Sequence, residues 1–290
     1  MWTQATAGEH LRANWTNVKS VIAFLGIGKL WTFYEGALSR AQIENILSSF
    51  ESYSVMREES HPKNRKYQGF SMPTHLWNVC ESDSFSVEEL SGSNQGVKHI
   101  LCVLNTFSKM AFVYPMMDRS GQSGLDAVKD IFTFANVYPD ALVSDAGGET
   151  SCKLIVDFLH KKGTKTIIAQ GSNKVSLQSI AIRPMLVMGS FFTLPSQASS
   201  VERFQRTLQK RIYTYMQENQ TNTFLNVLPD IVYNYNNTIH STTKRYTSFL
   251  CLFLIQIHCG HLPRCLSLCC ICHLFYHVSF SLLMGLSPMV

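Results

Sequence analysis

Two acidic residues could supply carboxylate oxygens to a site, and such oxygens are the ligands that hard divalent cations prefer. Asp145 ends a short apolar run, 141–144, and is followed closely by Gly147 and Gly148. A carboxylate at the carboxyl end of a buried strand, next to glycines, is well placed for a site at a sheet edge. The same pattern also describes an ordinary turn residue after a strand, and the local sequence by itself favours that simpler interpretation.

The second acid, Glu202, lies in segment 201–216, where apolar residues recur at helical spacing. Glu202, Arg206 and Lys210 follow one another at intervals of four on the neighbouring stripe of the same helix. A carboxylate one turn before two cations is typical of an exposed, ion-paired helix face. Taken alone, this pattern therefore predicts a solvated surface rather than a catalytic group.

The elements that must position these acids alternate between strand and helix from residue 77 onward. Apolar runs of strand length and segments with helical spacing follow one another, and two early strands are adjacent in the sequence. This order predicts a mixed α/β sheet with helices on both faces. The expected strands are 98–105, 111–117, 141–144 and 165–169, and the expected helices are 125–135, 152–159, 201–216 and 224–236.

A small helical region and a linker are expected before this sheet, in residues 1–76. Segment 37–50 has apolar residues at helical spacing, and Ser39 is a suitable N-cap. Segment 57–68 is polar and contains Pro62, which favours a linker or an extended arm. The core is expected to occupy residues 77–248.

Four segments of this core, taken in order, carry a resemblance to a known family. HILCVLNTFSKMAFVYPM, SDAGGE, SSVERFQRTLQKRI and VLPDIVYNYNNTIHSTTK are similar to motifs in the catalytic core of retroviral-type integrases, which retrotransposons and large DNA transposons carry. Four matches in order are more specific than any one motif. The resemblance implies a ribonuclease-H-like fold with a five-stranded mixed sheet, and it implies DNA integration as the ancestral activity.

The resemblance also implies a metal site. In the family two Asp and one Glu hold Mg²⁺ or Mn²⁺, and a pair of such ions supports displacement at a phosphodiester. Asp145 and Glu202 match the second Asp and the Glu, so they are the expected metal ligands. Arg206 and Lys210, one and two turns after Glu202, are expected to approach DNA, and Lys174 is a further candidate.

The first acid of the family's set departs from the pattern. The family writes it as W-x-x-D, whereas here Trp77 is followed at that spacing by Cys80. A thiol is a poor ligand for Mg²⁺, so catalysis is expected to be impaired. Asp83 is the next Asp and the third candidate, but a shift of three residues along a strand reverses the side chain, so a local rearrangement is expected. On this view Cys80→Asp, with the insertion described next removed, should improve activity.

The spacing between the second and third acids is also unusual. The family has about 35 residues there, whereas 56 residues separate Asp145 from Glu202. Segment 177–198, 22 residues long, has no regular period and contains two prolines. Its length accounts for the excess, so we expect it to be an insertion, such as non-coding DNA read through in a gene model.

The last segment, 249–290, departs from the family altogether. It holds six of the nine cysteines and one charged residue, Arg264. Its run 265–286 is long enough to cross a bilayer, although His273 and His277 weaken that interpretation. A zinc site at its Cys and His residues is a weaker alternative than translated non-coding sequence. The other three cysteines are scattered, as in a protein of a reducing compartment.

Several functions stay open at this point. The net charge of +5 permits a polyanionic partner without requiring one. The main expectation is an integrase-type core with DNA as partner, a homo-oligomer in the nucleus, with no small-molecule cofactor and no membrane partner. The rivals are a nucleic-acid-binding protein without catalysis, a membrane protein anchored by its tail, and a damaged copy that never folds.

Overall fold

The computed structural model describes residues 2–55, 73, 75–145, 151–169 and 199–247. The expected insertion at 177–198, the tail at 249–290 and the candidate Lys174 therefore lie outside the described residues.

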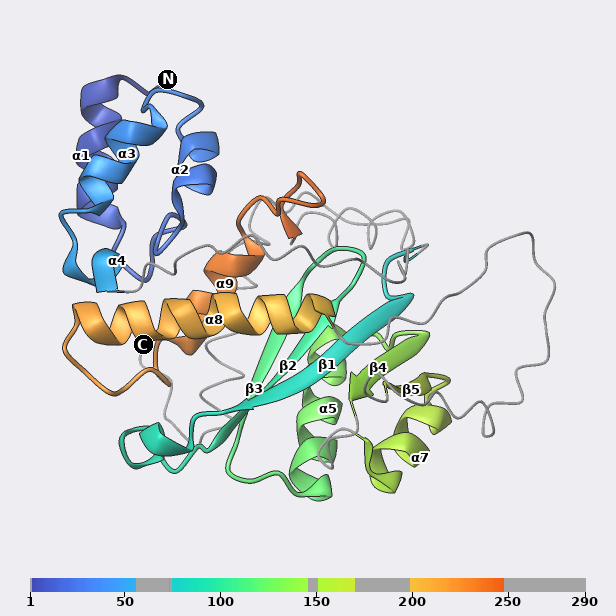
Figure 1. Cartoon of the computed structure of the whole chain (residues 1–290). Helices are drawn as coiled ribbons and strands as arrows, with labels where there is room; N and C mark the ends of the chain where they lie inside the picture. The colour runs from blue at the N-terminus through green and yellow to red at the C-terminus, as the bar shows by residue number, and fades with distance from the viewer. Residues whose placement is uncertain (1, 56–72, 74, 146–150, 170–198, 248–290) are drawn as a thin grey trace, which may run out of the picture.

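A five-stranded mixed sheet forms the centre of the fold (Figure 1). Its strands are β1 (Val79–Ser86), β2 (His99–Asn105), β3 (Ala111–Met116), β4 (Ala141–Asp145) and β5 (Lys165–Ala169). The order across the sheet is β3-β2-β1-β4-β5. The pairs β1–β2 and β2–β3 are antiparallel, whereas β1–β4 and β4–β5 are parallel. The ribonuclease-H-like arrangement expected from the sequence is thereby confirmed.

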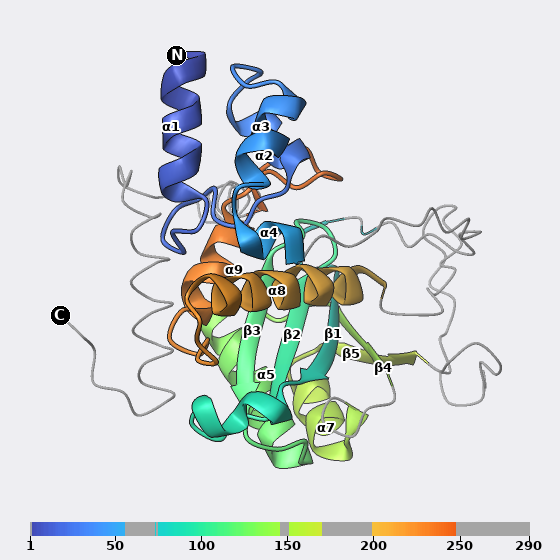
Figure 2. The ribbon, with the colours of Figure 1, turned by 60° about the vertical axis from the view of Figure 1, so that its left-hand side comes forward.

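Helices cover both faces of this sheet (Figure 2). One face packs against α5 (Gly121–Ala135) and α7 (Lys153–Lys161), and the other against α8 (Ser199–Glu218) and α9 (Leu228–Asn236). A short 3-10 helix, η1 (Glu88–Ser93), follows β1. All four expected core helices are present, with ends that differ by a few residues.

The alternation of side chains along the strands divides the core into two clusters. Cys80, Leu101 and Val103 face α5 and α7, whereas Phe85 and Cys102 face α8 and α9. Successive side chains of a strand point to opposite faces, so odd and even positions of β1 belong to different clusters. This alternation decides which acids of β1 can meet the acid on α8.

The N-terminal residues fold into four helices with a core of their own (Figure 1). These are α1 (Gln4–Asn14), α2 (Ile27–Phe33), α3 (Arg40–Leu47) and α4 (Glu51–Val55). Ser39 caps α3 in a capping box, as the sequence predicted. The helices α1 and α2 were missed, because their apolar residues do not recur with a clear helical period.

The N-terminal helices pack directly on the sheet domain. Helix α4 contacts α8, and the side chain of Asn234 donates a hydrogen bond to the carbonyl of Val18 at 2.5 Å. The ammonium of Lys29 lies 5.9 Å from the ring centre of Tyr235, within cation–π range. The two regions therefore share an interface beside α8 and α9.

Asn236 ties α9 to an edge strand of the sheet. Its side-chain oxygen accepts a hydrogen bond from the backbone N–H of Ala111 at 2.9 Å, and its amide nitrogen donates to the Ala111 carbonyl at 2.8 Å. The residue is only 4% exposed. A buried amide that satisfies both backbone groups of another residue is costly to replace.

We expect Asn236→Asp to lower the free energy of unfolding by about 1–3 kcal/mol, because a carboxylate cannot donate to the Ala111 carbonyl. Urea denaturation followed by circular dichroism measures the change. Asn219→Asp is the matched control, since Asn219 is exposed and bonds within its own helix end. Equal stability of the two variants would contradict the role given to Asn236.

Candidate active site

Two of the candidate acids lie on neighbouring parallel strands. In the pairing of β1 with β4, Ser82 is opposite Ser144. One residue further along each strand come Asp83 and Asp145, which are therefore neighbours across the sheet. Asp145 is the last residue of β4 and is exposed, and Asp83 is partly buried. The sheet edge predicted for Asp145 thus also receives Asp83.

The third acid reaches the same place from the helix that covers this face. Helix α8 packs on β1 and β2, and Glu202 is in its first turn. Burial, together with the charges of Asp145 and Glu202, raises the pKa of the Asp83 carboxyl to about 6. The charges of Asp145 and Glu202 thus reach Asp83, and we refer to Asp83, Asp145 and Glu202 as the acidic cluster.

Neighbouring polar groups hold Asp83 in this position. Its carboxylate accepts a hydrogen bond from the backbone N–H of Ser84 at 2.8 Å. The side chain of Gln205, one turn after Glu202 on α8, lies beside it and lowers the pKa of Asp83 in opposition to the burial. Gln205 is 7% exposed. The hydrogen bond to this carboxylate thus comes from the strand, whereas the buried amide nitrogen of Gln205 has no hydrogen-bond partner among the described residues.

The inference drawn from Cys80 was wrong about its place in the fold. Cys80 has no exposed surface and packs with Leu101, Val103 and Leu142 against α5 and α7. It lies on the face of the sheet opposite Glu202, so the thiol does not stand where a ligand of the acidic cluster would. Asp83 needs no rearrangement. It lies three residues after Cys80, so its side chain is on the opposite face of β1, toward α8.

A fourth acid, Glu81, escaped the sequence analysis. It is 6% exposed and shares the α8-facing side of β1 with Asp83. One carboxylate oxygen accepts hydrogen bonds from the backbone N–H groups of Ser200 and Val201, each at 2.9 Å. Burial raises the pKa of Glu81, while these bonds and the charge of Lys109 act against the rise. The sequence offered one signal for Glu81: it lies two residues before Asp83 and therefore on the same face of the strand.

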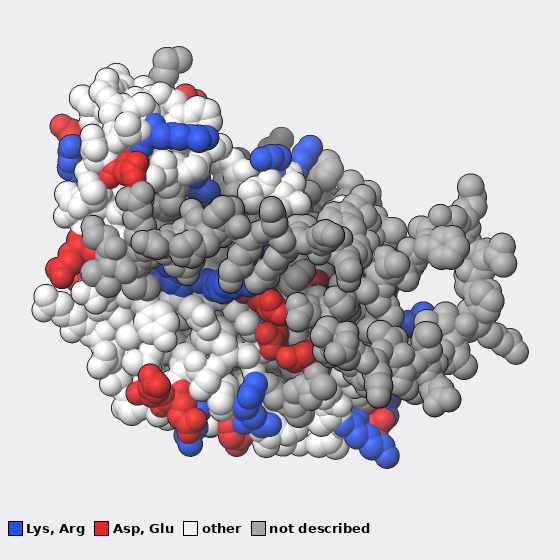
Figure 3. All heavy atoms as spheres, in the orientation of Figure 1, with Lys and Arg blue, Asp and Glu red and all other residues white. Residues whose placement is uncertain are grey.

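Basic side chains continue from the acidic cluster along α8 (Figure 3). Arg203, Arg206 and Lys210 are exposed on this helix. Arg206 lies 3.8 Å from the carboxylate of Glu202, so the ion pair left open as an alternative is present. An exposed pair of this kind contributes little to stability and leaves the cation accessible to another anion.

The donor set of the cluster suits a hard divalent cation, which prefers carboxylate oxygens. The charges of Asp145 and Glu202 act on Asp83, and a cation bound among the three carboxylates would compensate them. Among the described residues, no three His, Cys, Asp or Glu side chains already stand close enough to form a metal group.

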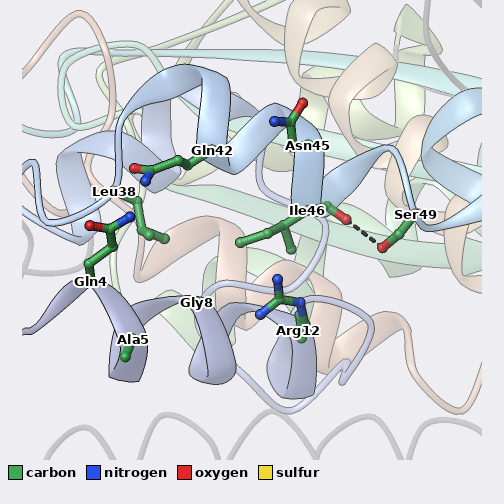
Figure 4. A pocket seen from close by; sticks show the side chains of 9 residues that line it. All are labelled: Gln4, Ala5, Gly8, Arg12, Leu38, Gln42, Asn45, Ile46 and Ser49. Carbon is green, nitrogen blue, oxygen red and sulfur yellow. Dashed lines mark hydrogen bonds between the residues drawn. The ribbon is translucent and has the colours of Figure 1, made fainter.

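Two further features lie apart from this cluster. A cavity of about 600 Å³ opens between α1 and α3 and is lined by polar groups such as Arg12, Gln42 and Asn45 (Figure 4). None of its lining residues belongs to the acidic cluster. Separately, every helix in the described part of the chain is too short or too polar to span a bilayer.

The chain is similar in sequence to proteins of transposons. No family model matches it. It is 24% identical over 147 residues to a transposon-derived protein of Caenorhabditis elegans, covering 51% of this chain and 43% of that protein. It is 20% identical over 268 residues to the retrovirus-related Pol polyprotein from transposon gypsy of Drosophila melanogaster, covering 91% of this chain and 22% of the polyprotein. The chain thus spans less than half the length of either relative.

Two solved structures superpose on this chain at low sequence identity. A chain of the simian T-cell lymphotropic virus intasome in complex with PP2A regulatory subunit B56 gamma superposes with a TM-score of 0.49 and 12% identity, over 83% of this chain and 70% of that one. The HTLV-2 integrase catalytic core domain, in complex with magnesium in a trimeric form, gives 0.44 and 11%, over 63% of this chain and 99% of that one.

Proposed function

We propose that this chain, an integrase-type core related to transposon proteins, joins DNA strands by displacement at a phosphodiester. The observation that carries the proposal is the acidic cluster, in which Asp83, Asp145 and Glu202 come from two adjacent strands and the helix above them. A set of carboxylates that repel one another and face one sheet edge is suited to Mg²⁺ or Mn²⁺. Such ions, when bound, activate the attacking oxygen and stabilise the leaving one.

In this proposal the acidic residues would hold the metal ion, and the basic residues would position the DNA. Asp83 and Asp145, fixed by the pairing of β1 with β4, would supply oxygens from the sheet. Glu202 would supply oxygens from α8, opposite the sheet. Arg206 and Lys210, one and two turns on, would meet phosphates of the DNA by charge and hydrogen bonding. Lys174 remains a candidate contact, and a homo-oligomer acting in the nucleus remains the expected setting.

Glu202→Gln tests the proposal most directly. Joining of a labelled DNA duplex by the purified chain, with Mg²⁺ or Mn²⁺, should fall by about 100-fold or more, because a neutral amide loses the charge that holds the ion. Glu218→Gln, at the other end of α8, is the matched control and should retain wild-type activity. A wild-type chain that binds DNA in a salt-sensitive manner but never nicks or joins it would favour the rival function, nucleic-acid binding without catalysis.

A further inference from the structure

The N-terminus of helix α8 is capped by a carboxylate from another element, strand β1. The first N–H groups of a helix have no partner within it, and a nearby Ser, Thr, Asp or Asn usually satisfies one of them. In α8 a single oxygen of Glu81 accepts from both Ser200 and Val201, at 2.9 Å each, across 119 and 120 residues of sequence. These two hydrogen bonds therefore hold the start of the helix on strand β1.

The residues in this contact are close in sequence to two acids of the cluster. Glu81 lies two residues before Asp83 on the same face of β1, and Val201 directly precedes Glu202. Any movement of the start of α8 along the sheet changes the separation between the carboxylates of Asp83 and Glu202. Two short bonds to a side chain that is 6% exposed restrict that movement.

A partly buried cation, Lys109, lies near Glu81 and acts on its charge. The ammonium of Lys109, in the turn between β2 and β3, lies 3.5 Å from the hydroxyl oxygen of Ser200. Its charge also acts on Glu81, and burial lowers the pKa of Lys109. The cation and the two N–H donors at the helix N-terminus offset part of the cost of burying this carboxylate, and burial remains the larger effect on its pKa. The acceptor oxygen at position 81 is therefore the feature that the start of α8 requires.

We propose that Glu81 is a positioning residue, which fixes the start of α8 on β1 and so sets the distance between Glu202 and Asp83. The inference rests on the proposed function for its catalytic consequence, although the fastening itself is independent of it. We assign Glu81 to holding the helix rather than to metal binding, because α8 engages one of its carboxylate oxygens with two hydrogen bonds. Its effect on the reaction passes through Glu202.

The test compares Glu81→Ala with the conservative Glu81→Gln and with Glu88→Ala, a control on η1 whose carboxylate is exposed and paired with Lys98. In the full chain, Glu81→Ala should lower the rate of metal-dependent joining by about 100-fold, since a small displacement of a reacting group has that effect. It should also raise the Mn²⁺ concentration needed for half-maximal rate several-fold. DNA affinity should stay unchanged.

Hydrogen exchange provides a reading that does not depend on catalysis. Amides at the start of α8, from Ser200 to Phe204, should exchange faster in Glu81→Ala, while those of β2 stay protected. If the wild type joins no DNA, the proposed function fails, yet this exchange still decides whether Glu81 holds the helix. Wild-type exchange together with a wild-type metal requirement in Glu81→Ala would overturn the inference.

The glutamine variant covers the case in which Glu81→Ala does not fold. Its amide oxygen can still accept from Ser200 and Val201, so we expect protection close to wild type and a rate within about tenfold of it. Normal protection at the start of α8 combined with a loss of activity as large as that of Glu202→Gln would show that Glu81 is a ligand. That result would also overturn the positioning role.

Discussion

Asp83→Asn is expected to abolish metal-dependent DNA joining, with a loss of about 1000-fold or more, while making the metal-free protein more stable. The loss follows from the place of Asp83 between Asp145 and Glu202, where its charge would hold the ion. The gain follows from the same geometry. Without a cation the charge of Asp83 is buried among like charges, and a neutral amide removes that repulsion.

The pH dependence of stability reports the same balance. The folded chain raises the pKa of Asp83 from 3.8 to about 6, so it binds the proton more tightly than the unfolded chain does. The contribution of this group to stability is therefore greatest below its unfolded pKa and declines as pH rises through about 6. Since the carboxyl is partly exposed, we expect Asp83→Asn to gain about 1 kcal/mol at neutral pH, after allowance for solvent screening.

Urea denaturation in EDTA at about pH 5 and about pH 7.5 measures this gain, which should be larger at the higher pH. Asp126→Asn, an exposed position on α5, is the control and should show no such difference. With Mn²⁺ present the order should reverse, because the ion stabilises the wild type and not the variant. An Asp83→Asn variant that keeps its joining activity would remove Asp83 from the site.

The sequence predicted the sheet well because its strands and helices differ in period. Each apolar run of the core became a strand, and the stripe of α8 became a buried helix face. The failure at β1 has a different origin. The tryptophan spacing of the family was used to count to the first acid, whereas the fold selects residues by face. Asp83 and Cys80 differ by an odd number of residues, and only the register with α8 shows which one faces the cluster.

Glu81 could not be found from the sequence, for a related reason. A helix cap is normally sought within a few residues of the helix start. Here the cap is 119 residues before Ser200, and the contact exists only because β1 passes beneath α8. Such a contact is set by tertiary packing, so no local pattern records it. Local sequence patterns predict where helices and strands lie. The packing of these elements against one another decides which polar residues come into contact.

Cys80→Asp is expected to destabilise the chain by about 3–5 kcal/mol and to restore no activity. Cys80 is completely buried with Leu101, Leu142 and Ile155 between the sheet and its covering helices. A carboxylate in such apolar surroundings either remains charged without a partner or takes up a proton at neutral pH, and both outcomes cost free energy. It would lie on the opposite side of β1 from Glu202, beyond reach of a shared ion.

Thermal and urea denaturation of Cys80→Asp beside Cys80→Ala separates the charge from the loss of volume. The alanine variant leaves only a small cavity and should lose about 1 kcal/mol, retaining whatever metal-dependent activity the wild type has. The aspartate variant should be largely unfolded, or should unfold at a much lower temperature and at a midpoint that rises as the pH is lowered. A Cys80→Asp chain that is stably folded and more active than wild type would mean that position 80, not position 83, faces α8, and the acidic cluster would have to be rebuilt around it.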